Sequence, residues 1–528
     1  MRVAAFASAV LPLFISYAAS QEWIVDEFKN QDGTPFRAID GPTVVRQGPD
    51  LRYYVGSKGI VTALKVDDDY RVTDVCTSKN FGVDRSVLGL TFDPRHFTEK
   101  DIFLYIATSK LNWGGGRHGE PELFPYGWMN GMVQIMRSNQ GGHCLAVTKN
   151  LVTGLSVSNH DHGVNGMVVD LDGTLKVLNG GMTNAGFSEK GDGDGGAPET
   201  PLSGALLTVR HNIATFNGEV KYDTPNGRLA NVANNPDVSV FAPGFMNAFS
   251  VELHTNGGLY VTDNGPNPGY GKESTSCTVN LESEPHTDDA LYLAEEGKWF
   301  GHPNRNRGRS DAKQCVYQGA GKTEAIVRME SSTNGLAEYA SNKRGSGWKG
   351  ALILARIGFH GGNNDRGNSF AFFLSDKKTV ARREELLEVG GLDAIVDIES
   401  NVVMTDFMVR SLVVLRTAEE GGVAAQRAVV WSVLPRRGPA EGGNRVWVRG
   451  RFPQRGLTVM LGSRLCSDVR VAREGLLSCR VPKGTAGGQV KVTIGLGRWF
   501  SRSYGADYTY MTEKRATLEP LLLETPAL

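Results

Sequence analysis

Apolar residues along most of this chain fall in short runs separated by turns that are rich in Asp, Asn and Gly. One arrangement recurs: an apolar strand, a polar turn and a second apolar strand. It is found at residues 88–106, 166–177, 248–261 and 392–404. Strands of another kind lie between the copies, for example at residues 59–64 and 204–209. This pattern predicts antiparallel sheets made of consecutive strands, with few long helices.

The wide spacing of the copies predicts the blades of a β-propeller. A single twisted sheet cannot bury both of its faces, so the blades must close into a ring. About 380 residues at roughly 60 per blade predict six blades. A large β-sandwich is the alternative, but it would not repeat one arrangement at such intervals. We therefore expect an all-β, six-bladed propeller over residues 21–423.

The composition changes near Ala424, where a turn-rich segment leads into a second set of strands. These expected strands are residues 446–450, 457–461, 476–480, 489–494 and 506–510. Strands this short, in roughly 80 residues, predict a small separate β-sandwich over residues 424–511. We expect residues 512–528 to form a flexible tail.

The first twenty residues have the pattern of a secretory signal peptide. Arg2 supplies a positive charge, an apolar stretch covers residues 3–17, and the small residues 18–20 precede a cleavage site before Gln21. The apolar stretch is shorter than the about 20 residues that a membrane-spanning helix needs, and no later segment is long and apolar enough. We expect a secreted, extracellular protein with no membrane span.

The cysteines agree with an oxidising compartment. The chain has six of them, and none forms a Cys-x-x-Cys pair, which argues against a zinc site. Up to three disulfides are therefore expected. Cys466 and Cys479 are close in sequence and are expected to pair, and Cys277 with Cys315 is the next candidate pair.

The overall charge excludes one class of partner. The 57 Lys and Arg residues equal the 57 Asp and Glu residues, so the formal net charge is zero. Proteins that bind nucleic acid usually present a basic field, so we expect no nucleic-acid partner.

The C-terminal segment resembles the IPT/TIG family over about residues 429–511. The matching features are Gly450 with Phe452, Gly462 before Cys466, the strand at residues 477–482, and Tyr508-Thr-Tyr510. The resemblance implies an immunoglobulin-like sandwich that binds or spaces other parts and contributes no chemistry.

Residues 45–415 resemble the soluble quinoprotein glucose/sorbosone dehydrogenases and the propeller of hedgehog-interacting-like secreted proteins. The matching segments are residues 88–94, His162 ahead of Asp172-Gly173, residues 244–247, residues 259–266, Asp288-Asp-Ala-Leu-Tyr292 and Phe300-Gly-His-Pro303. The resemblance implies a sugar or polyol substrate, with pyrroloquinoline quinone and calcium as cofactors. In that family a His removes the hydroxyl proton, and an Arg-Asn pair supports the reduced quinone.

Carried over residue by residue, the resemblance places His162 at the base position. An imidazole titrates near neutral pH and suits this role, although a turn histidine bonded to backbone is the plain alternative. Asn247 keeps its place in the Arg-Asn pair, but Met246 replaces the cation. Asp84 aligns loosely with a cofactor-binding glutamine. The family's late-blade cations are not recognisable around Arg356 or residues 405–410, which argues against binding of a tri-anionic cofactor.

The resemblance also implies a calcium site. Gly265 and Pro266 match the turn whose carbonyl groups ligate calcium, and Asp288 and Asp289 match an acidic pair nearby. Carbonyl and carboxylate oxygens suit calcium. An ordinary turn with solvated carboxylates is the alternative. The acidic loop at residues 191–196 is a weaker candidate.

Two functions remain open, and the sequence does not decide whether the protein is an enzyme. The first is a secreted quinone-dependent dehydrogenase of an aldose or polyol. The second is a non-catalytic binding or adhesion protein that recognises an extracellular glycan or protein. In the second case the loops at residues 110–130 and 267–287 would supply aromatic contacts from Trp113, Tyr126, Trp128 and Tyr270. Basic residues around the propeller axis would favour the enzyme, and an apolar mouth would favour the binder.

Overall fold

A computed structural model describes most of the chain. The described residues are 23–78, 82, 84–112, 127–138, 144–188, 197–224, 230–358, 367–417, 428–496, 499–500 and 505–512. The expected signal peptide, the loop at residues 191–196, Trp113 and Tyr126 lie outside these ranges, as does most of the expected tail. Among the described residues no helix is long and apolar enough to cross a membrane.

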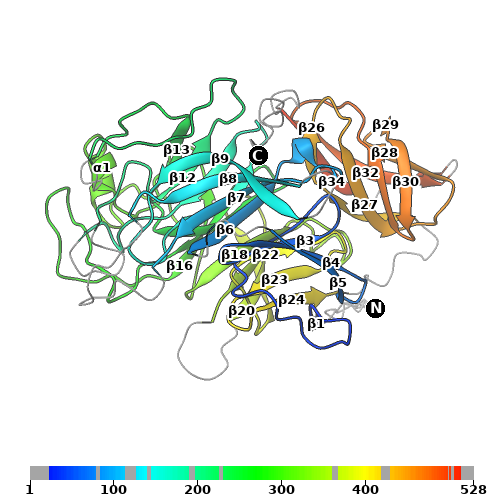
Figure 1. The fold of residues 1–528 in the computed structure, drawn as a ribbon, viewed down its shortest axis with the longest axis horizontal. Coiled ribbons are helices and arrows are strands. Elements are labelled where there is room, and N and C mark those ends of the chain that lie inside the picture. Colours follow the sequence, from blue (N-terminus) through cyan, green and yellow to red (C-terminus); the bar gives the residue numbers. More distant parts are fainter. Residues whose placement is uncertain are drawn as a thin grey trace, which may run out of the picture.

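The first part of the described chain forms six antiparallel sheets of four strands each (Figure 1). The first three sheets contain β2 (Val44–Gln47), β3 (Tyr53–Gly56), β4 (Val61–Val66) and β5 (Val72–Thr77); β6 (Arg85–Phe92), β7 (Phe103–Lys110), β8 (Gly131–Ser138) and β9 (Leu145–Leu155); and β10 (Val164–Val169), β11 (Leu175–Asn179), β12 (Ala205–Val209) and β13 (Val238–Pro243).

The other three sheets contain β14 (Asn247–Leu253), β15 (Leu259–Asn264), β16 (Asp289–Ala294) and β17 (Val327–Met329); β18 (Thr333–Tyr339), β19 (Ala351–Arg356), β20 (Asn368–Leu374) and β21 (Val380–Leu387); and β22 (Ala394–Val396), β23 (Val402–Asp406), β24 (Ser411–Arg416) and β1 (Ile24–Glu27). Three short helical turns, η1 (Pro94–His96), α1 (Arg305–Gly308) and η2 (Ala312–Cys315), lie in the connections.

The sheets are arranged as a propeller around one axis. The first strand of each sheet contacts the first strand of the next, so that β2, β6, β10, β14, β18 and β22 form a closed ring. The N-terminal strand β1 pairs with β24 and completes the last sheet, which joins the two ends of the propeller. The predicted all-β propeller fold is confirmed.

The inner strands are buried on both faces, and glycine allows them to approach closely. All six residues of β10 are buried. A Cβ atom on Gly166 of β10 would lie 2.6 Å from the carbonyl oxygen of Phe249 in β14. A Cβ atom on Gly89 of β6 would lie 2.3 Å from the carbonyl oxygen of Asn165 in β10. The glycines in the recurring strands therefore serve contacts between neighbouring sheets.

The C-terminal segment is a two-sheet sandwich, as predicted. One sheet has the order β25 (Val429–Leu434), β27 (Arg445–Arg451), β31 (Leu476–Arg480) and β30 (Ser467–Arg473). The other contains β26 (Arg437–Pro439), β34 (Ala506–Met511), β32 (Gln489–Leu496), β28 (Leu457–Leu461) and β29 (Arg464–Leu465), with β33 (Trp499–Phe500) beside β32. We call these residues, 428–512, the C-terminal module.

The cysteines form three disulfides. The two predicted pairs, Cys277–Cys315 and Cys466–Cys479, are confirmed, and the third links Cys76 to Cys144. Each bond closes a loop and restricts the unfolded chain, which stabilises the folded protein.

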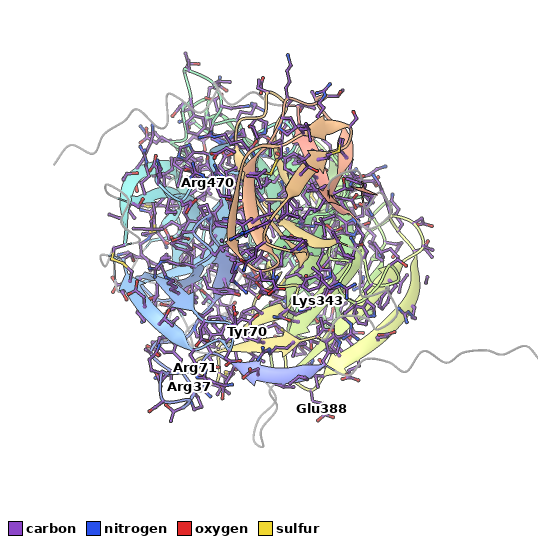
Figure 2. All side chains as sticks on the ribbon, turned by 90° about the vertical axis from the view of Figure 1, so that its right-hand side faces the viewer. Arg37, Tyr70, Arg71, Lys343, Glu388 and Arg470 are labelled. Carbon is purple, nitrogen blue, oxygen red and sulfur yellow. A yellow bond between two sulfur atoms is a disulfide. The ribbon has the colours of Figure 1, made fainter. Side chains whose placement is uncertain are left out.

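The C-terminal module covers one end of the propeller. The inner strands finish at this end, which we call the lower end. They begin at the opposite end, which we call the upper end. In Figure 2 the module lies in front of the ring of sheets. The Trp447 side chain donates from Nε1 to the carbonyl oxygen of Pro49 at 2.7 Å, and Arg449 pairs with Glu399 at 2.6 Å. The module is therefore packed against the propeller and not held apart from it.

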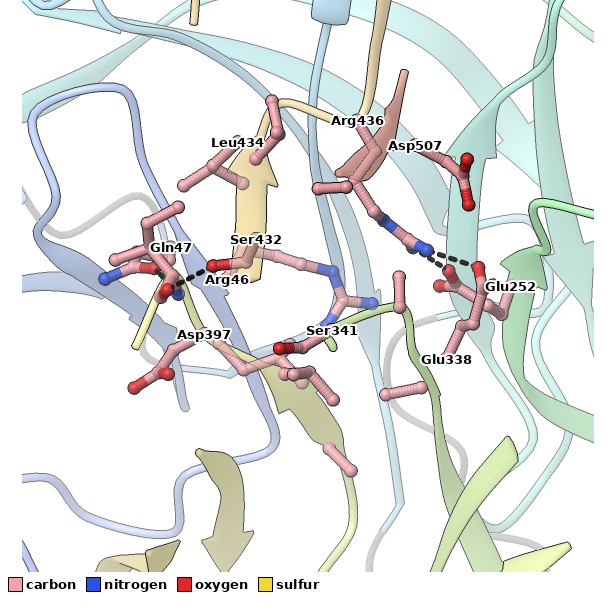
Figure 3. A pocket seen from close by; sticks show the side chains of 18 of the residues that line it. Arg46, Gln47, Glu252, Glu338, Ser341, Asp397, Ser432, Leu434, Arg436 and Asp507 are labelled. Atoms are coloured by element: carbon pink, nitrogen blue, oxygen red, sulfur yellow. Dashed lines mark hydrogen bonds and ion pairs between the residues drawn. The ribbon is translucent and has the colours of Figure 1, made fainter. Parts of the chain in front are cut away.

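One arginine forms the central contact of this packing. Arg436 of the module pairs with Glu252 of β14 and Glu338 of β18, two carboxylates from neighbouring inner strands (Figure 3). The Glu338 side chain is fully buried and also accepts hydrogen bonds from Thr255. Burial alone would raise the pKa of Glu338, but the charge of Arg436 outweighs it and lowers this pKa. The arginine therefore neutralises a carboxylate that water does not reach.

A cavity of about 160 Å³ remains beside this contact. Its charged groups already have partners. Arg46 pairs with Asp393 at 2.5 Å, and Asp397 accepts hydrogen bonds from Tyr53 and Tyr70 at 2.7 and 2.6 Å. Such saturated pairs favour a structural role for this cavity.

Substitution of Arg436 tests the contact. We expect Arg436→Ala to lower the free energy of unfolding by about 3 kcal/mol, because it leaves Glu338 buried without its cation. Urea unfolding of the full chain measures this. The exposed Arg480→Ala is the control and should change the value by less than about 0.5 kcal/mol. Equal effects of the two substitutions would contradict this account.

Candidate active site

The candidate site lies at the upper end, and its first member is His162, which precedes β10. The loop before β10 is held by Ser158, whose N–H donates to the carbonyl oxygen of His162 at 2.9 Å. The Ser158 hydroxyl in turn accepts from the N–H of His162 at 3.1 Å. His162 is only 3% exposed. The loop therefore fixes the histidine in the wall of the upper end.

Hydrogen bonds define the tautomer of the His162 ring. Its Nδ1 lies 3.0 Å from the carbonyl oxygen of Gly181, which can only accept, so Nδ1 carries the proton. Nε2 is then the acceptor nitrogen, and it lies 3.7 Å from the Asp161 carboxylate. Burial would raise the pKa of Asp161, but a hydrogen bond from His160 and the charges of both histidines lower it to about 2. An imidazole held in this way beside a carboxylate can take up a proton at Nε2, because the carboxylate stabilises the charged ring.

The structure brings His162 and Asn247 together across Gly180. A Cβ atom on Gly180 would lie 2.8 Å from the Cβ of His162 and 3.0 Å from Oδ1 of Asn247. The side-chain oxygen of Asn247 accepts from Nδ2 of Asn165 at 2.9 Å. This bond directs the amide so that its Nδ2 hydrogens are the donors available to a ligand.

Met246 is held in place through its backbone. Its N–H donates to the Asp263 carboxylate at 3.0 Å, and its carbonyl oxygen accepts from the N–H of Gly181 at 2.6 Å. The N–H of Asn247 donates to the same carboxylate at 3.0 Å. Burial raises the pKa of Asp263 well above its ordinary value. The sequence analysis missed this aspartate, although it belongs to the matched segment 259–266.

One small cavity is lined by three of the four predicted calcium ligands, Gly265, Pro266 and Asp288, whereas the fourth, Asp289, is engaged by backbone N–H groups. Asp289 is buried, and its carboxylate accepts from the N–H groups of Gly265 and Thr333 and from the Asn264 side chain. Burial raises its pKa to about 7. The carbonyl oxygen of Pro266 accepts from the N–H of Thr287 at 3.3 Å, and Asp288 is exposed. Asp289 therefore organises the turn, and the described residues contain no group of three or more His, Cys, Asp or Glu that could hold a metal.

Asp84 precedes β6, the inner strand next to β10 in the ring. Its carboxylate is 3.5 Å from the ammonium group of Lys110. Next to it, Arg85 is buried and donates to Thr108 and to the carbonyl oxygen of Asn130. On the other side, Arg356 donates to Asn368 at 2.7 Å and to the carbonyl oxygen of Ser331 at 3.2 Å. These arginines therefore support the backbone within their own sheets.

Apolar side chains gather at the upper end, on the side away from Asp84. Phe249, Ile357 and Leu392 form a buried cluster against which Phe407 packs. Ile357 directly follows Arg356, the last residue of β19, and Arg356 is paired with the first residue of β18. Leu392 precedes β22. The cluster thus lies near the start of three inner strands. Tyr270, from the loop at 267–287, contacts the His160 ring with the centroids 5.3 Å apart.

A second histidine behind the site was missed in the sequence. His302 donates from Nε2 to the buried carboxylate of Glu199 at 2.8 Å. The same carboxylate accepts from the N–H groups of Met182 and Thr183, next to Gly181. Burial would raise the pKa of Glu199, but His302 outweighs it and lowers it to about 2. The motif Phe300-Gly-His-Pro303 was noted, but its carboxylate partner is 103 residues away.

Residues 428–510 match the IPT/TIG domain family. Comparison with curated proteins gave no match.

Among solved structures, a glucose dehydrogenase-type oxidoreductase of Thermus thermophilus is 15% identical, with a TM-score of 0.47, over 75% of this chain and all of that one. The PQQ-bound aldose sugar dehydrogenase of Streptomyces coelicolor is 12% identical, with a TM-score of 0.46, over 75% of this chain and 98% of that one. The calcium structure of a Trichoderma reesei carbohydrate-active enzyme of family AA12 is 13% identical, with a TM-score of 0.45, over 76% of this chain and 97% of that one.

The residues at the upper end do not fit pyrroloquinoline quinone in the position that the resemblance implies. This cofactor is a tri-anion, and a fixed cation is the usual partner of its negative charge. Met246 offers no charge, Arg356 is bonded to its own sheet, and the nearby cluster around Phe249 is apolar. Next to Met246 and the Phe249 cluster, the carboxylates of the quinone would have no cation to balance their charge.

Substitution of Glu199 tests the support behind His162. Glu199→Gln removes the charge that several N–H groups and the Thr183 hydroxyl share, so we expect a loss of about 3 kcal/mol in unfolding free energy at pH 7. The folded-state pKa of Glu199, about 2, is lower than its ordinary value of 4.5. Its contribution is therefore present above about pH 4.5 and is lost as the pH falls towards 2.

Urea unfolding at pH 7 and at pH 3 measures this difference. Glu219 is exposed, and Glu219→Gln is the control. Its free energy of unfolding should equal that of the natural protein at both pH values. If Glu199→Gln lowers the free energy of unfolding by the same amount at pH 7 and at pH 3, the lowered pKa assigned to Glu199 is wrong.

Proposed function

We propose that the protein is secreted and recognises a sugar or polyol at the upper end of the propeller. The observation that carries this proposal is the placement of His162 and Asn247 on either side of Gly180. The imidazole nitrogen Nε2 accepts a hydroxyl proton in a hydrogen bond, and the Asn247 amide donates to a hydroxyl oxygen. Two such groups, one in the loop before β10 and one at the start of β14, would match neighbouring hydroxyls of a sugar.

The surroundings support recognition more than redox chemistry. Sugar rings have apolar faces as well as hydroxyl groups, and the cluster around Phe249 and the ring of Tyr270 suit such faces. The three disulfides are consistent with export to an oxidising compartment. The described part of the C-terminal module packs against the lower end, the end opposite to His162.

Oxidation of the bound hydroxyl is the second candidate function, and the His162 tautomer favours it. With Nδ1 protonated, Nε2 of His162 would take the hydroxyl proton, and Asp161 would stabilise the charged ring. The hydride of the same carbon would need a two-electron acceptor such as pyrroloquinoline quinone. Calcium, if used, would rely on the carbonyl groups of Gly265 and Pro266 and on Asp288. The activity would have to proceed without an arginine at position 246.

Calorimetric titration of the full-length protein with a panel of aldoses and polyols tests the proposal. We expect saturable binding to at least one sugar, weakened at least about tenfold in His162→Ala and in Asn247→Ala, since each loses a buried hydrogen bond. The matched control is His254→Ala. His254 is also buried and bonded to a backbone carbonyl, that of Gly350, but it lies at the lower end. This control should bind within about twofold of the natural protein.

Titration with pyrroloquinoline quinone, with and without calcium, separates the two candidates. Recognition is supported if the protein binds sugar but binds no quinone and shows no sugar-dependent dye reduction. Calcium-dependent quinone binding, with dye reduction that is lost in His162→Ala, overturns recognition in favour of the dehydrogenase. Absence of both sugar and quinone binding contradicts both candidates.

A further inference from the structure

Charge is divided unequally between the two parts of the molecule. Residues 428–510 contain 14 of the 57 Lys and Arg residues but only 4 of the 57 Asp and Glu residues. Their net charge is +10, and because the chain is neutral overall, the remainder carries −10. A division this strong indicates an interaction with a partner of opposite charge.

Part of the positive charge is used to hold the module on the propeller. Arg436 pairs with Glu252 and Glu338, and Arg449 and Arg473 share Glu399. These contacts account for the arginines that face the lower end. They do not account for Arg445, Arg470 and Arg480 of the sheet formed by β27, β31 and β30.

Three arginines of that sheet converge on a single carboxylate. Arg470 donates from Nε and Nη2 to Asp468 at 3.0 Å, Arg480 lies 3.5 Å from it, and Arg445 pairs with it as well. The side chains of Arg470 and Arg480 are 63% and 53% exposed. Arg470 is labelled in Figure 2. Arg445 also donates to the Ser478 hydroxyl, and Arg480 donates to the carbonyl oxygen of Gly443, both at 3.0 Å. Because each guanidinium has five N–H donors, Arg470 and Arg480 keep donors for other acceptors.

These arginines line a cleft of about 190 Å³ between the module and the loop that follows β6. The propeller contributes Arg95, Glu99 and Lys100. Arg95 is balanced by Asp93, at 2.6 Å, whereas the exposed Lys100 side chain forms no ion pair among the described residues. With Glu99 and Asp468 counted, the cleft keeps a net charge of about +2.

We propose that this cleft binds the sulfate or carboxylate groups of an acidic polysaccharide. Arginine forks match the paired oxygens of such groups. The cleft is concave and formed by two parts of the chain, so a single polysaccharide strand can lie in it. A flat bilayer would reach only its rim, and a nucleic-acid duplex is too wide for it. Trp447, which is bonded to Pro49, supplies a fixed apolar wall for a sugar ring.

The site goes beyond the sugar-binding function proposed for the upper end and does not depend on it. The module covers the lower end, so a polysaccharide held in this cleft leaves the upper end uncovered. The protein would then be anchored to an acidic extracellular matrix at its lower end, and the end that contains His162 and Asn247 would stay uncovered.

Binding of the full-length protein to immobilised heparin, used as a sulfated probe, tests the proposal. We expect binding at 0.15 M salt that weakens as salt increases, because ion pairs with the sulfates are screened. The double variant Arg470→Ala with Arg480→Ala should bind about tenfold more weakly and with a shallower salt dependence. The two side chains are exposed, so we expect this double variant to keep its fold. An unchanged thermal unfolding temperature verifies this.

The control removes the same charge from the propeller surface. Arg71 and Arg382 are 41% and 51% exposed and are each paired with carboxylates of their own strands or turns. The double variant Arg71→Ala with Arg382→Ala should bind heparin within about twofold of the natural protein. Uncharged dextran should not bind, and His162→Ala should bind heparin normally.

Three outcomes would overturn the proposal. The first is no binding to heparin at 0.15 M salt. The second is an equal loss in the two double variants. The third is binding to phosphatidylserine vesicles or to duplex DNA that is as tight as binding to heparin at the same salt concentration.

Discussion

The ring of inner strands is the constraint on which the rest of the structure depends. Each inner strand is buried between two neighbours, and glycines such as Gly89 and Gly166 let the backbones approach within contact distance. The pairing of β1 with β24 closes the ring and ties the N-terminal strand to the last sheet. Because the six strands run in the same sense, their starting points gather at one end and their final residues at the other.

The two ends consequently have different chemistry. At the upper end the loops before the inner strands present His162 and Asn247, supported by the carboxylates of Glu199 and Asp263, next to an apolar cluster. At the lower end, acidic residues at the ends of inner strands receive arginines from the C-terminal module. The module thus neutralises the propeller and occupies the end that holds no candidate catalytic group.

The sequence predicted what depends on local pattern. Alternating apolar runs with glycine predicted the strands, and proximity in the chain predicted the pairs Cys466–Cys479 and Cys277–Cys315, which are confirmed. Contacts between distant residues could not be predicted in this way. Arg436 meets Glu338 across 98 residues, and His302 meets Glu199 across 103. The acidic pair Asp288 and Asp289 suggests a metal site in the sequence, but the sequence does not show the backbone N–H groups that bond to Asp289 in the fold. The calcium site stays a proposal. The roles of His162, Asn247, Met246 and Asp84 remain proposals.

The central claim is that the upper end holds sugar hydroxyls on His162 and Asn247 without a quinone. A crystal structure of the protein soaked with the sugar that binds most tightly tests it most directly. The account predicts sugar density at the upper end, with one hydroxyl within hydrogen-bond distance of Nε2 of His162 and another near Nδ2 of Asn247. Sugar bound elsewhere, or a co-purified quinone over the propeller axis, would contradict it.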